Sequence, residues 1–144
     1  WQTGHNQFSK FQHHESNSVR VLPFINLMSD AYALSDLVIS RAGALTLSEI
    51  TVCGKPSILI PFPDAAGDHQ MKNAEVLAKA NAAQLIEEKD LSSFLLVETV
   101  LRLLRNKEKL EQEKKIISKK KNINFCPPQY SCNKFFKKYK KKFS

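Results

Sequence analysis

Short apolar runs alternate with longer segments of mixed polarity along most of the chain. A short apolar run bounded by glycine, proline or polar residues is typical of a buried strand, and an apolar period near 3.6 is typical of a helix. The apolar runs predict strands over residues 19–25, 37–40, 57–61 and 83–86. The mixed segments predict helices over residues 28–34, 45–52, 69–81 and 91–109.

Local signals set several of these boundaries. Gly54 and the proline two residues later end the helix 45–52, and Asp90 is expected to cap the helix 91–109. Pro23 limits the ladder of the strand 19–25 because proline has no N–H to donate. Residues 5–18 are polar and predict a loop or a poor helix.

Alternating strands and helices predict an α/β fold, a Rossmann-like parallel sheet with flanking helices. The length of 144 residues allows one compact domain, which we place at residues 1–113. Residues 114–144 contain eleven lysines and no acidic residue, and without these lysines the net charge of +8 becomes −3. We therefore expect a lysine-rich, largely disordered tail after residue 113, which by itself explains the basic character of the chain.

Composition excludes several function classes. No apolar run approaches the roughly 20 residues that span a bilayer. Neither His13 and His14 nor Cys126 and Cys132 have the spacing of a metal site, so no metal is expected. An odd number of cysteines fits a reducing, cytoplasmic setting. The interleaved lysines and aromatic residues of the tail would suit anionic lipid or RNA, but an unstructured tail is equally compatible with them.

The most informative segment, residues 40–49, follows an apolar run and opens a helix through Gly43. The free N–H groups at a helix start and the helix dipole favour a phosphate. Arg41 would add a positive fork, Thr46 a hydroxyl and Glu49 an acceptor for sugar hydroxyls. The pattern predicts a site for a nucleotide sugar, although Thr46 would serve equally as a first-turn cap without a ligand.

Several short motifs, which occur in the same order as in a known family, carry a resemblance to it. They are residues 1–4 (Trp-Gln-Thr-Gly), 23–28 (Pro-Phe-Ile-Asn-Leu-Met), 41–49 (Arg-Ala-Gly-Ala-Leu-Thr-Leu-Ser-Glu), 61–63 (Pro-Phe-Pro) and 68–74 (Asp-His-Gln-Met-Lys-Asn-Ala). Over residues 21–110 the chain resembles the MurG-type N-acetylglucosaminyltransferases of glycosyltransferase family 28. One such motif alone would be weak evidence for the family, but several motifs at the expected spacing are specific evidence.

The resemblance implies the carboxy-terminal, donor-binding half of a two-domain GT-B enzyme. Such an enzyme transfers GlcNAc from UDP-GlcNAc to a lipid-linked muramyl-pentapeptide, lipid I to lipid II in peptidoglycan synthesis. It does so without a metal or cofactor, as a peripheral protein on the cytoplasmic face of the bacterial inner membrane. No specific nucleic acid is expected as a partner. The residues that the resemblance places against UDP-GlcNAc are Phe24 and Ile25 (uracil), Arg41, Ala44, Leu45 and Thr46 (diphosphate), Glu49 (ribose), and His69, Gln70 and Asn73 (GlcNAc).

The chain also departs from the family pattern. We expect the amino-terminal domain with its acceptor loop and proposed base, and the first strand of this domain with its phosphate loop, to be absent. The lysine-rich tail stands in place of the family's closing helix. No catalytic residue is therefore assigned, and the chain alone is expected to be inactive, a fragment of a longer enzyme. Two alternatives are a donor-binding subunit that joins a separate partner chain, as in the dolichol-type GlcNAc transferase, and a non-catalytic remnant.

Overall fold

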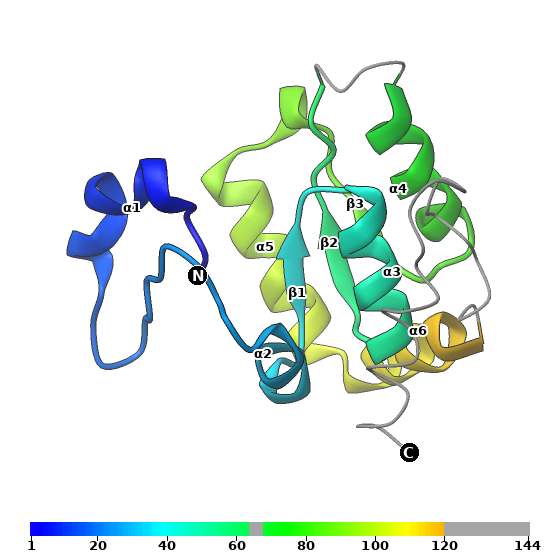
Figure 1. Cartoon of the computed structure of the whole chain (residues 1–144). Helices are drawn as coiled ribbons and strands as arrows, with labels where there is room; N and C mark the ends of the chain where they lie inside the picture. The colour runs from blue at the N-terminus through cyan, green and yellow to red at the C-terminus, as the bar shows by residue number, and fades with distance from the viewer. Residues whose placement is uncertain (64–67, 120–144) are drawn as a thin grey trace. The chain divides into compact units, whose positions relative to one another are not determined.

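The computed structural model describes residues 1–63 and 68–119, drawn in colour in Figure 1. The chain divides into two compact units after Leu34. Each unit is described by itself below. The candidate residues Phe24 and Ile25 belong to the first unit, and the other candidate site residues belong to the second.

The first unit is built around one parallel contact between two extended segments. Gln2 forms an isolated bridge with Leu22, whose N–H donates to the Trp1 carbonyl at 2.8 Å. The strand predicted over 19–25 is therefore wrong, because only Leu22 pairs with another extended segment in the described part of the chain. A pairing of two strands alone is marginal, and Pro23 cannot donate to extend it.

Short helices complete this unit. Helix α1 (His5–Phe11) follows Gly4, which has a φ of 80°, and continues into the 3₁₀ turn η1 (Gln12–His14). The poor helix that was one of two expectations for residues 5–18 is thus present. Helix α2 (Met28–Leu34) has the bounds predicted from the sequence.

The second unit contains a parallel sheet of three strands in the order β1-β2-β3. The strands are β1 (Val38–Ser40), β2 (Ser57–Leu59) and β3 (Gln84–Leu85), so each lies inside a predicted strand. The register places Ile39 opposite Ile58 and Leu59 opposite Leu85. Because all three strands are parallel, their carboxyl ends lie together at one end of the sheet, which we call its carboxyl end.

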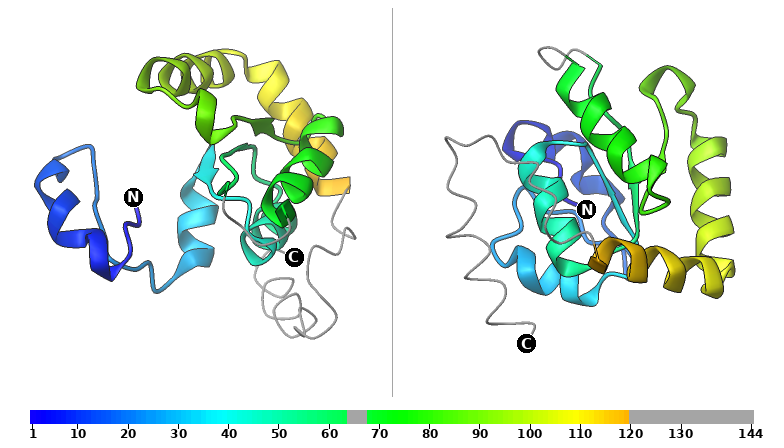
Figure 2. Two further views of the ribbon diagram at one scale, coloured as in Figure 1. Left: turned by 90° about the horizontal axis from the view of Figure 1, so that it is seen from above. Right: turned by 90° about the vertical axis from the view of Figure 1, so that its right-hand side faces the viewer.

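Helices cover both faces of this sheet. Helices α3 (Ala44–Cys53) and α4 (His69–Lys79) lie on one face and α5 (Ser93–Arg105) lies on the other (Figures 1 and 2). Helix α6 (Lys107–Lys119) crosses the opposite end, where the strands begin, which we call the amino end. This layering is the α/β arrangement that alternating strands and helices predicted.

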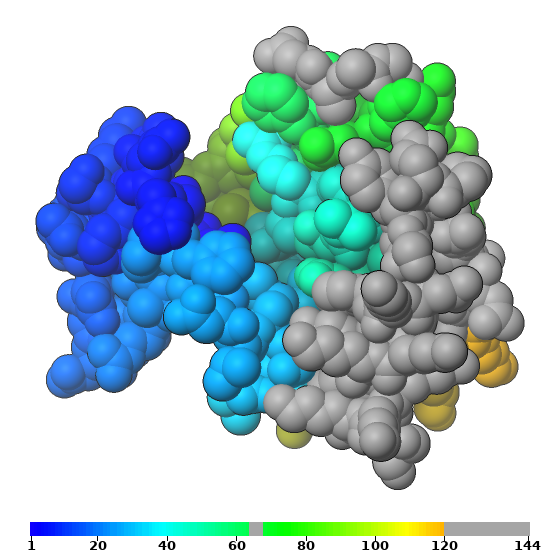
Figure 3. All heavy atoms as spheres, in the orientation of Figure 1, coloured from blue at the N-terminus to red at the C-terminus, as the bar shows by residue number. Residues whose placement is uncertain are grey.

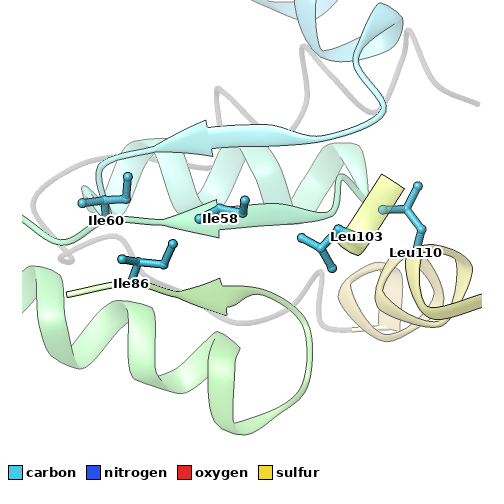
Figure 4. Close-up of a cluster of buried hydrophobic side chains, with 5 residues drawn as sticks. All are labelled: Ile58, Ile60, Ile86, Leu103 and Leu110. Atoms are coloured by element: carbon cyan, nitrogen blue, oxygen red, sulfur yellow. The ribbon is translucent and has the colours of Figure 1, made fainter. Parts of the chain in front are cut away.

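One cluster of the second unit's core lies between the sheet and α5 and α6. Ile58, Ile60, Ile86, Leu103 and Leu110 form one buried cluster from β2 and the chain after it, the segment after β3, α5 and α6 (Figure 4). Ile58 and Leu103 are completely inaccessible to solvent. The run Ser-Ile-Leu of β2 is buried at every position, as expected for the central strand of a sheet covered on both faces.

The segment predicted as one helix over 91–109 is two helices. Asn106 has a φ of −97° and a ψ of 81°, which ends α5, and its Oδ1 accepts from the Lys109 N–H at 2.9 Å. The same asparagine therefore ends one helix and caps the next. Asp90 is not the cap of α5, since it lies in the 3₁₀ turn η3 (Glu88–Asp90). Ser92 caps it by accepting from the Leu95 N–H at 3.1 Å.

Helix α6 continues through the boundary predicted at 113/114. Its residues Leu110, Glu113 and Ile117 are buried, so packing against the second unit extends to Ile117. The remainder of the predicted tail, residues 120–144, lies outside the described residues. The division between a domain and a tail therefore stays a prediction.

Candidate functional site at the carboxyl end of the sheet

The turn between β1 and α3 presents an open helix start. Gly43 occupies the N-cap position with a φ of −65° and a ψ of 142°, and its carbonyl accepts from the Leu47 N–H at 3.0 Å. Within the described residues, the N–H groups of Ala44, Leu45 and Thr46 have no hydrogen-bond acceptor. In Figure 3, cyan atoms of this part of the chain are visible at the surface. Three adjacent donors at an accessible helix start form a site for an anion.

Arg41 spans the carboxyl ends of all three strands from its place directly after β1. Its Nη1 donates to the carbonyls of Ile60 (3.4 Å) and Pro61 (3.3 Å), just beyond β2. The same Nη1 pairs with Oε2 of Glu88, which lies beyond β3. The guanidinium carbon lies 5.5 Å from the centre of the Phe62 ring. Contacts from one nitrogen thus fix the side chain at the point where the strands end.

The ion pair between Arg41 and Glu88 is open to solvent, with side chains 47% and 38% exposed. The hydrogen bond from the guanidinium is the main cause that lowers the pKa of the Glu88 carboxyl below its ordinary value; desolvation opposes it, and the charge of Arg41 adds a smaller lowering effect. Glu88 is therefore ionised at neutral pH and adds negative charge beside the arginine. An exposed pair of this kind contributes little to stability, so its importance lies in where it holds the guanidinium.

Leu45 and Thr46 precede Glu49 by four and three residues, so both lie on the same side of α3 as Glu49. Leu45 is 57% exposed, while Thr46 and Glu49 are half-buried. The opposite face of the helix is buried and includes Leu47 and Ile50. The structure therefore places the Thr46 hydroxyl and the Glu49 carboxylate on the accessible side of the helix whose free N–H groups follow Arg41.

Helix α4 is connected to the same end of the sheet through Gln70. Its Oε1 accepts from the Phe62 N–H at 3.0 Å, and the Phe62 ring faces Arg41. His69 is exposed at the first position of the helix, and Asn73 is half-buried one turn later. Gln70 thus has a structural contact besides the sugar contact that the resemblance implies. His69 and Asn73 remain available to a ligand on the same helix.

Phe24 and Ile25, the residues predicted to contact uracil, lie in the first unit. Phe24 is 54% exposed. The Ile25 N–H already donates to Oε1 of Gln2 at 2.9 Å. A uracil that paired with the Ile25 backbone would therefore meet the carbonyl directly and would have to displace Gln2 to reach the N–H.

Glu88 belongs to the candidate site through its contact with Arg41, and the sequence analysis did not identify it. It follows the strand predicted over 83–86 by two residues, at the same end of the sheet as Arg41. Because parallel strands end together, an acidic residue just after the neighbouring strand was the signal that could have identified it. Over residues 1–63 and 68–119, no group of three histidine, cysteine or acidic residues could hold a metal ion. None of the helices described there is long and apolar enough to span a membrane.

Comparisons with known proteins agree with this geometry. The sequence profile of the "Glycosyltransferase family 28 C-terminal domain" matches residues 1–124. A relative from Anaeromyxobacter sp. (strain K) is 53% identical over 92 residues, 64% of this chain and 24% of the relative. A relative from Cytophaga hutchinsonii is 40% identical over 108 residues, 75% of this chain and 29% of the relative.

Both relatives are named UDP-N-acetylglucosamine--N-acetylmuramyl-(pentapeptide) pyrophosphoryl-undecaprenol N-acetylglucosamine transferase. The crystal structure of MurG from Acinetobacter baumannii is similar to this fold with a TM-score of 0.72 and 32% identity, over 82% of this chain and 35% of that one. The chain spans between a quarter and about a third of the length of these proteins. The α/β fold predicted from the sequence is confirmed as that of the carboxy-terminal domain of a GT-B enzyme, and the chain belongs to glycosyltransferase family 28.

Proposed function

We propose that this chain is the donor-binding part of a hexosyltransferase that uses UDP-GlcNAc. The observation that supports this most directly is the combination at the carboxyl end of the sheet. There, Arg41 is held beside the helix start whose N–H groups at Ala44, Leu45 and Thr46 lack acceptors in the described chain. A pyrophosphate is the anion that this combination suits best, since it offers several oxygens to several donors at once.

The same groups would assist the reaction of the complete enzyme. As the bond between GlcNAc and UDP breaks, negative charge accumulates on the leaving diphosphate. A fixed guanidinium and fixed N–H dipoles stabilise that charge without reorganising. In this proposal the chain supplies stabilisation of the leaving group, while the acceptor site and the base belong to another domain.

The acceptor follows from the names of the relatives. We assign N-acetylmuramyl-(pentapeptide) pyrophosphoryl-undecaprenol to the complete enzyme, which makes its product the disaccharide-linked lipid of peptidoglycan synthesis. An undecaprenol chain stays in a bilayer, so the complete enzyme would work as a peripheral protein, on the cytoplasmic face where UDP-GlcNAc is available. Binding of the acceptor is assigned to the domain outside this chain.

Isothermal titration of the 144-residue chain with UDP tests the diphosphate site. We expect Arg41→Ala to weaken UDP binding about tenfold or more, because a charged hydrogen-bond donor is lost. Arg105→Ala is the matched control, since Arg105 is exposed in the last turn of α5 and forms no ion pair with a described residue. Equal affinities of the Arg41 and Arg105 variants would contradict the proposal, and no UDP binding by the parent chain would favour the remnant alternative.

The ribose contact of Glu49 has its own test. Glu49→Ala should weaken UDP binding about fivefold and should leave the binding of 2′,3′-dideoxy-UDP unchanged, since that ligand has no hydroxyls to donate to the carboxylate. Glu98→Ala, a change at an exposed glutamate of α5, is the control. A loss of affinity that is equal for both nucleotides would assign Glu49 a role in folding or general electrostatics instead.

A further inference from the structure

Within residues 1–63 and 68–119, the hydrogen bonds of the Arg41 guanidinium all come from one of its nitrogens. Each of its hydrogen bonds, to the carbonyls of Ile60 and Pro61 and to the carboxylate of Glu88, comes from Nη1. In the described part of the chain, Nε and Nη2 have no acceptor. The planar guanidinium therefore keeps one complete edge, with two parallel N–H directions, for a ligand.

We propose that Glu88 is a positioning residue that holds Arg41 by Nη1 so that the Nε and Nη2 edge receives the diphosphate. This inference rests on the proposed function. Two carbonyls beyond β2 and the carboxylate beyond β3 all accept from Nη1. Without Glu88, the long side chain would regain rotamers that point the guanidinium into solvent, and each binding event would have to order it again.

A competing interpretation would make Glu88 an internal anion that the diphosphate displaces. The contacts favour positioning, because an anion on the Nε and Nη2 edge leaves the Nη1 contact intact. The surroundings of Glu88 agree with a fixed role. The neighbouring Glu87 pairs with Lys89 at 2.8 Å, so that lysine is occupied locally and Glu88 faces Arg41.

Titration of the 144-residue chain with UDP and with uridine tests this assignment. We expect Glu88→Ala to weaken UDP binding about fivefold and to leave uridine binding unchanged, since uridine has no phosphate. Glu88→Gln should restore affinity to within about twofold of the parent, because its amide oxygen still accepts from Nη1. Glu87→Ala is the matched control, and the thermal midpoint of every variant should stay close to that of the parent.

The double variant separates this proposal from the proposed function. In an Arg41→Ala background, Glu88→Ala should cause no further loss of UDP affinity, because Glu88 acts through the arginine. Unchanged or tighter UDP binding by Glu88→Ala, beside a weakened Arg41→Ala, would overturn the positioning role and leave the diphosphate site standing. An Arg41→Ala variant that binds UDP like the parent would overturn both.

Discussion

The two ends of the three-stranded sheet hold carboxylates in opposite situations. At the carboxyl end, Glu88 is 38% exposed and pairs with Arg41, which lowers its pKa. At the amino end, Glu113 of α6 is only 2% exposed, and burial is the main cause that raises its pKa. The cation beside Glu88 stabilises its charged form, whereas burial disfavours the charged form of Glu113.

The partners of Glu113 explain the difference. Its Oε1 accepts from Nε2 of Gln84, the first residue of β3, at 2.8 Å. Its Oε2 is buried without a hydrogen-bond donor in the described part of the molecule. The hydrogen bond from the Gln84 amide and, less strongly, the charges of Lys109 and Arg102 offset only part of the cost of desolvating the carboxylate. The amino end is thus closed by α6 and its apolar residues, whereas the carboxyl end remains open to a ligand.

This contrast follows from the parallel topology. Helices α3 and α5 begin near the carboxyl end (Figure 1), so the first N–H groups of both helices and the loops before them gather there. Changes at the amino end and in the core should therefore alter stability, and changes at the carboxyl end should alter binding. The three predictions below test that division, starting with the largest expected effect.

The largest effect is expected in the core. Leu103→Ala should lower the free energy of unfolding by about 3 kcal/mol, because the side chain is completely buried between α5 and the sheet and its loss leaves a cavity. Leu104→Ala is the control on the same helix, where the side chain is 42% exposed and the loss should be below about 1 kcal/mol. Urea denaturation measures both, and similar losses would show that this face of α5 is not the packed one.

Gly54 should give an intermediate effect. It ends α3 with a φ of 64°, and a Cβ at this position would lie 2.7 Å from the Ser118 Oγ of α6. Gly54→Ala should lower the free energy of unfolding by about 1 to 2 kcal/mol, because alanine is strained at this φ and the Ser118 hydroxyl must move away.

Gly43→Ala gives the comparison at the carboxyl end. There the φ is −65° and a Cβ would meet only the Thr46 Oγ1 at 4.0 Å, so we expect a smaller loss in the same urea experiment. A larger loss for Gly43 than for Gly54 would contradict the division between the two ends.

The smallest effect depends on pH. Because the pKa of Glu113 is raised in the folded state, the folded protein holds this proton more tightly than the unfolded chain. The parent therefore loses stability as pH rises from the unfolded pKa through the folded one. Glu113→Gln should gain about 1 kcal/mol at neutral pH and almost nothing near about pH 4, since its amide keeps the Gln84 contact.

Glu88→Gln is the matched comparison for this pH dependence. The pKa of Glu88 is lowered, so its small contribution is present above the unfolded pKa and is lost as pH falls through the folded one. Urea denaturation at several pH values should show a gain for the Glu113 variant and no gain for the Glu88 variant at neutral pH. A gain for Glu88→Gln would contradict the contrast between the two carboxylates.

Local signals predicted much of the fold correctly. The period of the apolar residues located α2, α3 and α4, and Gly54 marked the end of α3. The prediction was wrong for residues 19–25, which pair only at Leu22, and for residues 91–109, which Asn106 divides. In both places the backbone conformation was set by something other than the local period of apolar residues: by pairing with a distant segment at Leu22, and by the conformation of a single residue at Asn106.

The sequence by itself determined that a short strand would pass through Arg41 and Gly43 into a helix start, because apolar period and turn chemistry are local properties. Only the tertiary structure decided that Glu88, 47 residues away, would hold that arginine and that Glu113 would be buried against Gln84. Such partners are chosen by how strands align and helices pack. Local patterns along the chain do not reveal that alignment, because it depends on contacts between segments far apart in the sequence.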